Sequence, residues 1–207
     1  MRTILAIAGI ALLFASVLTD QKRAMCKYLP KQEAAIAAAQ IAHDKRAALP
    51  RTVKTVCIFD FDDTLVDTSK RLAATYKNTQ MYPAIQHMVR LLHALQKHSQ
   101  IVILTARASG AEALVARNCE AAGIRLKPSD IIATCPAHKK AAWRRDFCTQ
   151  KGLYLLLVAG DRDTDVEAVD KLSRDAVSLR TIPQNEHQDA LCESSAAFST
   201  WAQKPQP

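Results

Sequence analysis

The chain has few aromatic residues, which make up 5% of its 207 positions, and no basic stretch interleaved with stacking side chains. Proteins that bind single-stranded nucleic acid need such aromatic platforms, so the composition argues against a dedicated nucleic-acid module. The formal charge of +8 and the pI near 9.3 favour anionic partners, but lysine and arginine are spread along the chain. Nucleic acid is therefore compatible with the charge but is not the favoured partner.

Glycine and proline are also scarce, with 5 and 8 residues, and nearly half of the chain is hydrophobic. This composition predicts one well-packed domain and leaves too little length for two. The cysteines show no C-x-x-C spacing, which removes support for a zinc ribbon or a thioredoxin-like motif. Cys57 lies within an apolar run and is expected to be a small core residue. The other cysteines could form one or two disulfides after export. The six are Cys26, Cys57, Cys119, Cys135, Cys148 and Cys192.

The N-terminus carries the features of a leader. Residues 1–19 begin with Met1-Arg2-Thr3 and continue into an almost wholly apolar run at 4–18. A positive start followed by an apolar run of this length predicts a signal peptide and export. The cleavage site is weak, so a membrane anchor formed by residues 4–18 remains the alternative, and contact with a membrane is expected only through such an uncleaved leader.

Beyond the leader, segments whose apolar pattern is typical of helices alternate with segments typical of strands. An alanine-rich stretch at 29–49 predicts an amphipathic helix that ends before Pro50, within an N-terminal helical segment at 20–53. A core at 54–207 follows, and its continuous apolar strands predict a mainly parallel, five-stranded sheet in a Rossmann-like three-layer α/β sandwich. Strands are expected near 54–60, 100–105, 130–134, 153–159 and 176–181, and helices near 84–98, 109–122, 139–150, 164–173 and 187–202.

The first of these strands stops abruptly at the run Asp60-Phe61-Asp62-Asp63-Thr64. Ligands of open α/β sheets lie beyond the carboxyl ends of the strands, so these acids are expected at the mouth of a site. Side chains alternate along an extended chain, which places Asp60 and Asp62 on the same side. Two negative charges held so close favour a cation or a phosphoryl group between them.

Two later segments carry groups suited to an anion. The second strand ends in Thr105-Ala106-Arg107, where a threonine hydroxyl can donate to a phosphoryl oxygen. Farther along, a helix opens with two lysines, and the spacing places Lys140 on its core-facing side, whereas Lys139 falls on a neighbouring face. A buried ammonium needs an anionic partner, so Lys140 is preferred over Lys139 as a phosphate-binding residue.

The fourth strand ends in a further acidic run. Gly160 permits a tight turn there, and Asp161 and Asp165 can converge if a helical turn begins between them. Carboxylate oxygens of this kind are the ligands that Mg²⁺ prefers.

Taken in chain order, these strand-end residues resemble the four motifs of the haloacid dehalogenase-like superfamily. The resemblance spans residues 54–182 and is carried by Asp60-x-Asp62-x-Thr64, Thr105, Lys140, and Gly160-Asp161 with Asp165. Within that superfamily, the doubled acid Asp62-Asp63 and the leader are most similar to exported, periplasmic bacterial acid phosphatases of class B and the related IIIB group.

The resemblance implies a role for each residue. Asp60 would be the nucleophile that forms an aspartyl-phosphate, and Asp62 would protonate the leaving oxygen and then activate water. Thr105 and Lys140 would hold the phosphoryl oxygens, and Asp63 and Ala106 would complete the phosphate-binding set. A Mg²⁺ ion would be held by Asp60, by the backbone carbonyl of Asp62, by Asp161 and by Asp165.

The intervals between the motifs are largely filled by crossover helices, so no large cap domain is expected and the site should be open. A lid could come from residues 66–82, from the N-terminal helix or from a second copy in a homo-oligomer. Arg71 and Arg107 are the candidate residues for contacting the substrate.

Three functions are consistent with these features. The favoured one is an exported, Mg²⁺-dependent acid phosphatase that acts on small phosphomonoesters such as nucleotides. The alternatives are a polynucleotide 3′-phosphatase, which suits the open site and the positive charge, and a non-catalytic envelope protein that binds phosphate. An intact set of acids argues against the last.

Overall fold

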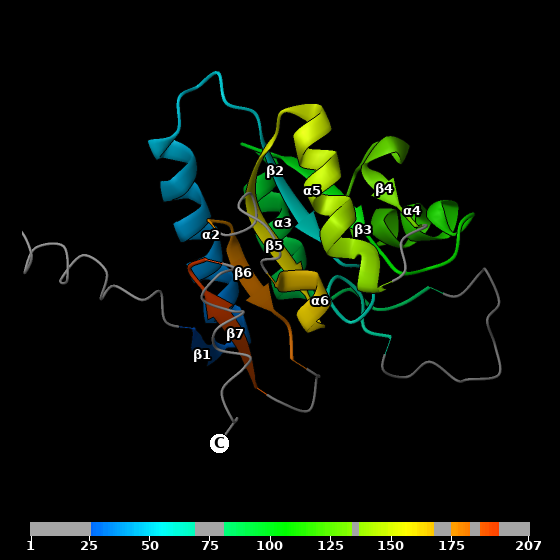
Figure 1. The fold of residues 1–207 in the computed structure, drawn as a ribbon. Coiled ribbons are helices and arrows are strands. Elements are labelled where there is room, and N and C mark those ends of the chain that lie inside the picture. The colour runs from blue at the N-terminus through cyan, green and yellow to red at the C-terminus, as the bar shows by residue number, and fades with distance from the viewer. Residues whose placement is uncertain (1–25, 69–80, 134–136, 168–174, 183–186, 195–207) are drawn as a thin grey trace, which may run out of the picture.

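The computed structural model describes residues 26–68, 81–133, 137–167, 175–182 and 187–194. These residues form one sheet covered by helices on both faces (Figure 1). The strands are β1 (Lys27–Pro30), β2 (Thr55–Phe59), β3 (Gln100–Leu104), β4 (Ile131–Ile132), β5 (Tyr154–Gly160), β6 (Val177–Arg180) and β7 (Gln188–Cys192). The α-helices are α2 (Lys31–Ala48), α3 (Gln86–Gln96), α4 (Glu112–Ala121), α5 (Lys140–Lys151) and α6 (Asp163–Val166), and two 3₁₀ turns, η1 (Pro128–Asp130) and η2 (Ala137–Lys139), lie beside β4 and α5.

The order of strands in the sheet is β1-β7-β6-β5-β2-β3-β4. The five strands from β6 to β4 are parallel, as expected from their apolar runs, and they confirm the mainly parallel three-layer architecture. From β2 the chain moves outward through β3 to β4 and then returns to β5 on the other side of β2. The connections therefore diverge at β2 and β5, and ligand sites of such sheets lie beyond the carboxyl ends of the strands at this point.

Two antiparallel strands extend the sheet beyond the five expected. β7 pairs with β6, and β1 pairs with β7 at the edge. The helix expected at 187–202 is wrong over β7, because Gln188–Cys192 is extended and its register with two neighbours overrides local helix propensity. A disulfide between Cys26 and Cys192 closes this edge, with a Cα–Cα distance of 4.2 Å.

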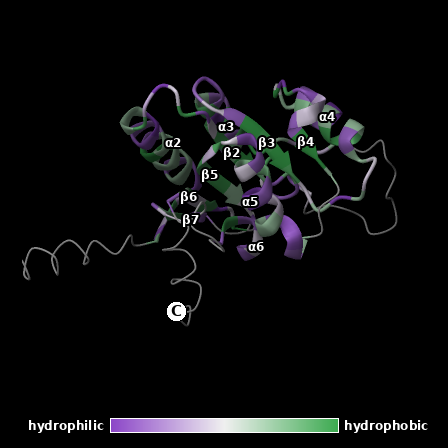
Figure 2. Cartoon of the chain, turned by 45° about the horizontal axis from the view of Figure 1, so that its top comes forward, coloured by the Kyte–Doolittle hydropathy of each residue, from purple (hydrophilic) through white to green (hydrophobic). Residues whose placement is uncertain are grey.

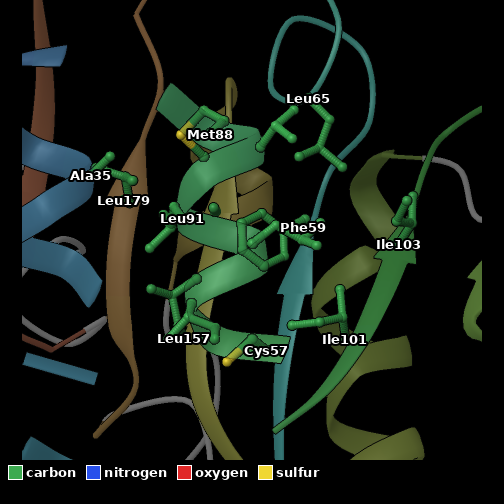
Figure 3. Close-up of a cluster of buried hydrophobic side chains, with 14 of the residues drawn as sticks. Ala35, Cys57, Phe59, Leu65, Met88, Leu91, Ile101, Ile103, Leu157 and Leu179 are labelled. Carbon is green, nitrogen blue, oxygen red and sulfur yellow. The ribbon is translucent and has the colours of Figure 1, made fainter. Parts of the chain in front are cut away.

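Alternating side chains of the central strands supply two hydrophobic layers. Cys57, Phe59, Ile101 and Ile103 face α2, α3 and α4, and Figure 3 shows Cys57 and Phe59 beside the turns of α3. Val56, Ile58, Val102 and Leu104 point to the opposite face, where α5 and α6 lie. In Figure 2 the central strands are mainly hydrophobic, whereas hydrophilic residues recur along the helices. The period of two thus explains why strands with no polar face lie between two helical layers.

The N-terminal helix α2 belongs to this core. Its buried residues are alanines on one face, and it packs against α3, β6 and β7. Small side chains allow a helix to approach its neighbour closely. The helix therefore lies along a face of the sheet beside α3 (Figure 1). In the described part of the chain, no helix combines the length and the apolar character that crossing a membrane requires. The expected leader at 1–19 lies outside the described residues.

Candidate active site

Asp60 lies directly after β2, at the carboxyl end of the strand. Its backbone N–H donates to the carbonyl of Ala159 at 2.8 Å, which extends the pairing of β2 with β5 by one residue. The side chain is 6% exposed. The strand pair thus delivers a carboxylate to the place where the chain connections diverge, as the sequence predicted.

Lys140, at the first residue of α5, meets this carboxylate. Its Nζ donates to Asp60 Oδ1 and to Asp165 Oδ1, at 2.6 Å in each case. The side chain is 3% exposed, whereas Lys139 is exposed to solvent. The structure therefore brings Lys140, and not Lys139, to the acids.

Asp161 and Asp165 follow the end of β5 and complete a group of three acids with Asp60. One ligand oxygen from each carboxylate lies within 4.8 Å of the others, the single such group among the described residues. A Cβ added to Gly160 would lie 2.2 Å from Cβ of Asp165, so only glycine allows α6 to turn this closely over the end of β5. Asp165 Oδ2 also accepts the backbone N–H of Arg162 at 3.1 Å.

The charges in this group are not balanced. Burial raises the pKa of Asp60 well above its usual value; Lys140 opposes this shift, and the carboxylates of Asp165 and Asp161 add to it. The pKa of Asp161 is raised by burial and by Asp165. For Lys140, burial alone would lower the pKa, but Asp60 and Asp165 outweigh it and raise the pKa. Nε of Arg162 lies 3.8 Å from Asp161 Oδ2, so two cations, Lys140 and the largely exposed Arg162, meet three acids, which leaves room for a further positive charge.

Asp62 points to a different partner. Its two oxygens accept Nε and Nη2 of Arg107 at 2.9 and 2.6 Å, a bidentate pair. The guanidinium lies 4.8 Å from the ring centre of Phe61 and 5.5 Å from that of Tyr82. Arg107, expected from sequence to contact the substrate, therefore lies beside the proposed acid of the site.

The turn after Asp62 is held by Asp63, which has a φ of 55°. Its N–H donates to the carbonyl of Val66 at 2.8 Å, and its Oδ1 accepts the N–H and the hydroxyl of Thr68 at 2.8 and 2.7 Å. The hydroxyl of Thr181 donates to the Asp63 carbonyl at 3.1 Å. In this structure Asp63 thus shapes the turn that presents Asp62.

Thr105 and Ala106 follow β3, the strand beside β2. The Thr105 side chain is fully buried, and its hydroxyl oxygen accepts the N–H of Arg107 at 3.3 Å. Ala106 is exposed. Arg71 lies outside the described residues, as does most of the segment at 66–82 that was expected to form a lid.

Sequence reasoning missed Arg144, which is 1% exposed. In the structure Lys140, Arg144 and Cys148 are buried, while Trp143 and Phe147 stack on each other at the margin with ring centres 4.7 Å apart. The four-residue spacing from Lys140 was the signal that could have found Arg144.

A groove of about 490 Å³ lies elsewhere, between α2 and α3. Alanine and leucine side chains form much of its wall, together with His43, His87 and His98. None of the three clustered acids lines it, so it is not part of the site described above.

The donor set of the acid cluster suits a hard divalent cation. Mg²⁺ is held in proteins by a few carboxylates and keeps several waters, and the cluster offers carboxylates at the mouth of a sheet. Burial raises the pKa values of Asp60 and Asp161, and the neighbouring carboxylates add to the rise. The residues present therefore fit a bound Mg²⁺ ion.

No family model matches the chain, and no curated protein matches it. The solved structures that resemble its fold include two of the class C acid phosphatase from Bacillus anthracis, one of them with tungstate bound. Each is 18% identical over 67% of this chain, with TM-scores of 0.50 and 0.53. The match covers 66% of the Bacillus anthracis chain. The α/β fold expected from the haloacid dehalogenase-like resemblance is thus the fold that the chain has.

Proposed function

We propose that this protein is a divalent-metal-dependent phosphomonoesterase that works through an aspartyl-phosphate. The observation that carries the proposal is the convergence of Asp60, Lys140, Asp161 and Asp165 at the carboxyl ends of β2 and β5. The fold that the chain shares with a class C acid phosphatase supports the same reaction class. Fold alone does not define an activity, so the argument depends on the chemistry of these side chains.

Asp60 is the proposed nucleophile. Its carboxylate attacks phosphorus in line with the leaving oxygen, the phosphorus–ester bond breaks, and an acyl phosphate forms on Asp60. Lys140, already 2.6 Å from Asp60 Oδ1, would bind an equatorial phosphoryl oxygen and offset the charge that develops there. The buried hydroxyl of Thr105, at the end of the neighbouring strand, is the proposed donor to a second oxygen.

Asp62 is the proposed general acid and base. It would give a proton to the leaving alcohol and then take one from the water that hydrolyses the acyl phosphate. Arg107 donates to both oxygens of Asp62 in this structure, and each oxygen keeps a second lone pair with which Asp62 could bind a proton. An incoming phosphoryl group is an alternative anionic partner for that guanidinium.

Mg²⁺ is the proposed cofactor. The carboxylates of Asp60, Asp161 and Asp165 would hold it together with the backbone carbonyl of Asp62, and it would supply charge stabilisation to the phosphoryl oxygens. Asp60 and Asp165 are also the carboxylates that Lys140 contacts, so its ammonium would orient both of them toward the ion.

Export is proposed from the leader at residues 1–19 and from the disulfide between Cys26 and Cys192. Disulfides persist in oxidising compartments, which include the bacterial periplasm.

Small phosphomonoesters such as nucleotides are the proposed substrates.

The test is a phosphatase screen of the mature protein over a chromogenic phosphomonoester, nucleotides, sugar phosphates and phosphopeptides, with Mg²⁺ or with EDTA. We expect hydrolysis with Mg²⁺ that EDTA abolishes and that added Mg²⁺ restores. Activity unaffected by EDTA would remove the metal from the mechanism. The absence of hydrolysis from every substrate, with Mg²⁺ binding retained, would favour a phosphate-binding protein without catalysis.

A further inference from the structure

Two buried cations lie on one face of α5, four residues apart. Lys140 is 3% exposed and contacts carboxylates, whereas Arg144 is 1% exposed and contacts backbone carbonyls. A buried guanidinium is costly unless its donors are hydrogen bonded. The groups that it meets therefore indicate what the arginine does.

Those groups are the carbonyls of Thr164, Asp165 and Glu167, around the end of α6. Arg144 Nη1 donates to the carbonyl of Asp165 and, at 3.4 Å, to that of Thr164. Arg144 Nη2 donates to the carbonyl of Glu167 at 2.7 Å. The hydroxyl of Ser178 donates to the remaining carbonyl, that of Val166, at 2.6 Å.

The last carbonyls of a helix have no partner within the helix, and α6 has only four residues, Asp163–Val166. A helix this short is not stable by itself, so outside groups must fix its position. The two nitrogens of the Arg144 fork bind carbonyls two residues apart, which a single lysine ammonium is too compact to reproduce.

We infer that Arg144 is a positioning residue that holds α6 so that the Asp165 carboxylate stays within the acid cluster. Asp165 is then fixed from two sides. Its carbonyl is held by Arg144, and its carboxylate is held by Lys140 and by the N–H of Arg162. This inference rests on the proposed function, because the cluster is the proposed Mg²⁺ site. Substitution of residues that hydrogen bond to metal ligands commonly changes the affinity for the metal.

The test measures Mg²⁺ binding by isothermal titration calorimetry on the full protein without substrate. R144K keeps the charge and loses the fork, and we expect Mg²⁺ to bind about tenfold more weakly. R145K is the matched control, because the neighbouring Arg145 side chain is 49% exposed and pairs with Asp146 on the surface. Its Mg²⁺ affinity should equal that of the wild type.

A second control, L92A, distinguishes the positioning of α6 from a general loss of stability. Leu92 is fully buried on α3, on the opposite face of the sheet from α5 and α6, so this variant loses stability without touching α6. Weaker Mg²⁺ binding by R144K alone supports the inference. Wild-type affinity in R144K, or an equal loss in L92A, overturns it.

The remaining outcomes are also decisive. If R144K does not fold at the assay temperature, R144Q, which keeps an N–H donor, is measured in its place. Failure of both to fold means that Arg144 is needed for the fold itself and overturns the positioning role. If the wild type binds no divalent ion, the metal site of the proposed function fails, and this inference fails with it. If the wild type binds Mg²⁺ and R144K matches it, only this inference fails.

Discussion

Asp60 and Lys140 depend on each other because both side chains are buried and each supplies the charge that the other needs. The ammonium contacts Asp60 and Asp165 at 2.6 Å. Burial and neighbouring carboxylates raise the pKa of Asp60, while Lys140 opposes the shift. Removing either member therefore changes stability as well as chemistry, so each substitution needs two measurements.

The nucleophile is tested by Asp60→Asn. An amide keeps the shape of the side chain but cannot form the acyl phosphate, so we expect phosphatase activity to fall by at least about a thousandfold. Circular dichroism should show an unchanged fold, because the amide oxygen can still accept from Lys140. Substantial turnover by this variant would refute Asp60 as the nucleophile.

The buried ion pair is tested by Lys140→Met in EDTA. Loss of the ammonium leaves uncompensated acids, and we expect the free energy of unfolding in urea to drop by about 3–5 kcal/mol. Mg²⁺ should recover part of this loss, because an ion that binds only the folded state stabilises it. The control is Lys139→Met, which alters an exposed neighbour and should leave stability unchanged. Equal effects of the two variants would contradict the assignment of Lys140.

At the scale of elements, the site depends on how closely α6 follows β5. Gly160 is the last residue of β5, and α6 begins three residues later at Asp163. Most of the carbonyls at the end of α6 are held by a side chain of α5 or of β6. Three elements thus fix the turn that carries Asp161 and Asp165.

Gly160→Ala tests this close approach. The added Cβ would lie 2.2 Å from Asp165 Cβ, so α6 must move away. We expect a loss of about 1–3 kcal/mol in stability and weaker Mg²⁺ binding by calorimetry. The control is Gly123→Ala, whose Cβ meets nothing within 4 Å but whose φ of +79° strains the backbone. It should reduce stability and leave Mg²⁺ affinity unchanged. Unaltered Mg²⁺ binding by Gly160→Ala would show that the turn tolerates a shift.

The buried thiol of Cys57 in β2 makes the stability of the fold depend on pH. Burial raises the pKa of Cys57 from 9.0 to about 12, partly opposed by hydrogen bonds from Ser99 and Leu157. An acid whose pKa is higher in the folded state stabilises the fold below its unfolded pKa, and this contribution is lost as pH rises toward the folded pKa. Stability should therefore fall above pH 9.

The measurement is urea unfolding of the wild type and of Cys57→Val at about pH 8 and about pH 10.5. Ionisation of the thiol removes up to about 1.4 kcal/mol per pH unit, and valine fills a similar volume without ionising. The wild type should lose more stability than the variant across this interval. The same loss in both proteins would mean that other groups govern the alkaline limit.

For the whole molecule, the disulfide ties the two ends of the described chain together. Cys26 and Cys192 are 166 residues apart, and their bond links the residue before the edge strand β1 to the last residue of its neighbour β7. A cross-link that closes a long loop restricts the unfolded chain, and removal of a native disulfide typically costs about 2–5 kcal/mol. The strands β2 and β5, whose carboxyl ends carry the acid cluster, lie inside the sheet, away from this edge.

We therefore expect the double variant Cys26→Ser/Cys192→Ser to unfold at lower urea concentration and to keep its phosphatase activity at 25 °C. Reducing agent should lower the stability of the wild type to that of the variant and leave the variant itself unchanged. A wild type that is indifferent to reduction would show that the bond contributes nothing to stability.

Much of the fold could be predicted from local pattern. The apolar runs of β2, β3 and β5 have no polar face, and strands of this kind form a parallel sheet between two layers of helices. Their carboxyl ends lie on one edge, and this pattern predicts that Asp60, Thr105 and Asp161 are neighbours. β1 and β7 were missed because a short antiparallel strand near the edge of a sheet is defined by its partners more than by its own residues.

The sequence by itself determined which residue types stand at the ends of the strands, because side-chain period and turn chemistry are local properties. Tertiary structure decided which of these side chains contact one another. Only the packing of α5 against α6 shows that Lys140 bridges Asp60 and Asp165 and that Arg144 is buried. Only the pairing of β2 with β3 brings Arg107 to Asp62. Such contacts join residues far apart in the chain, and their energies depend on burial and on neighbouring charges, which no local pattern contains.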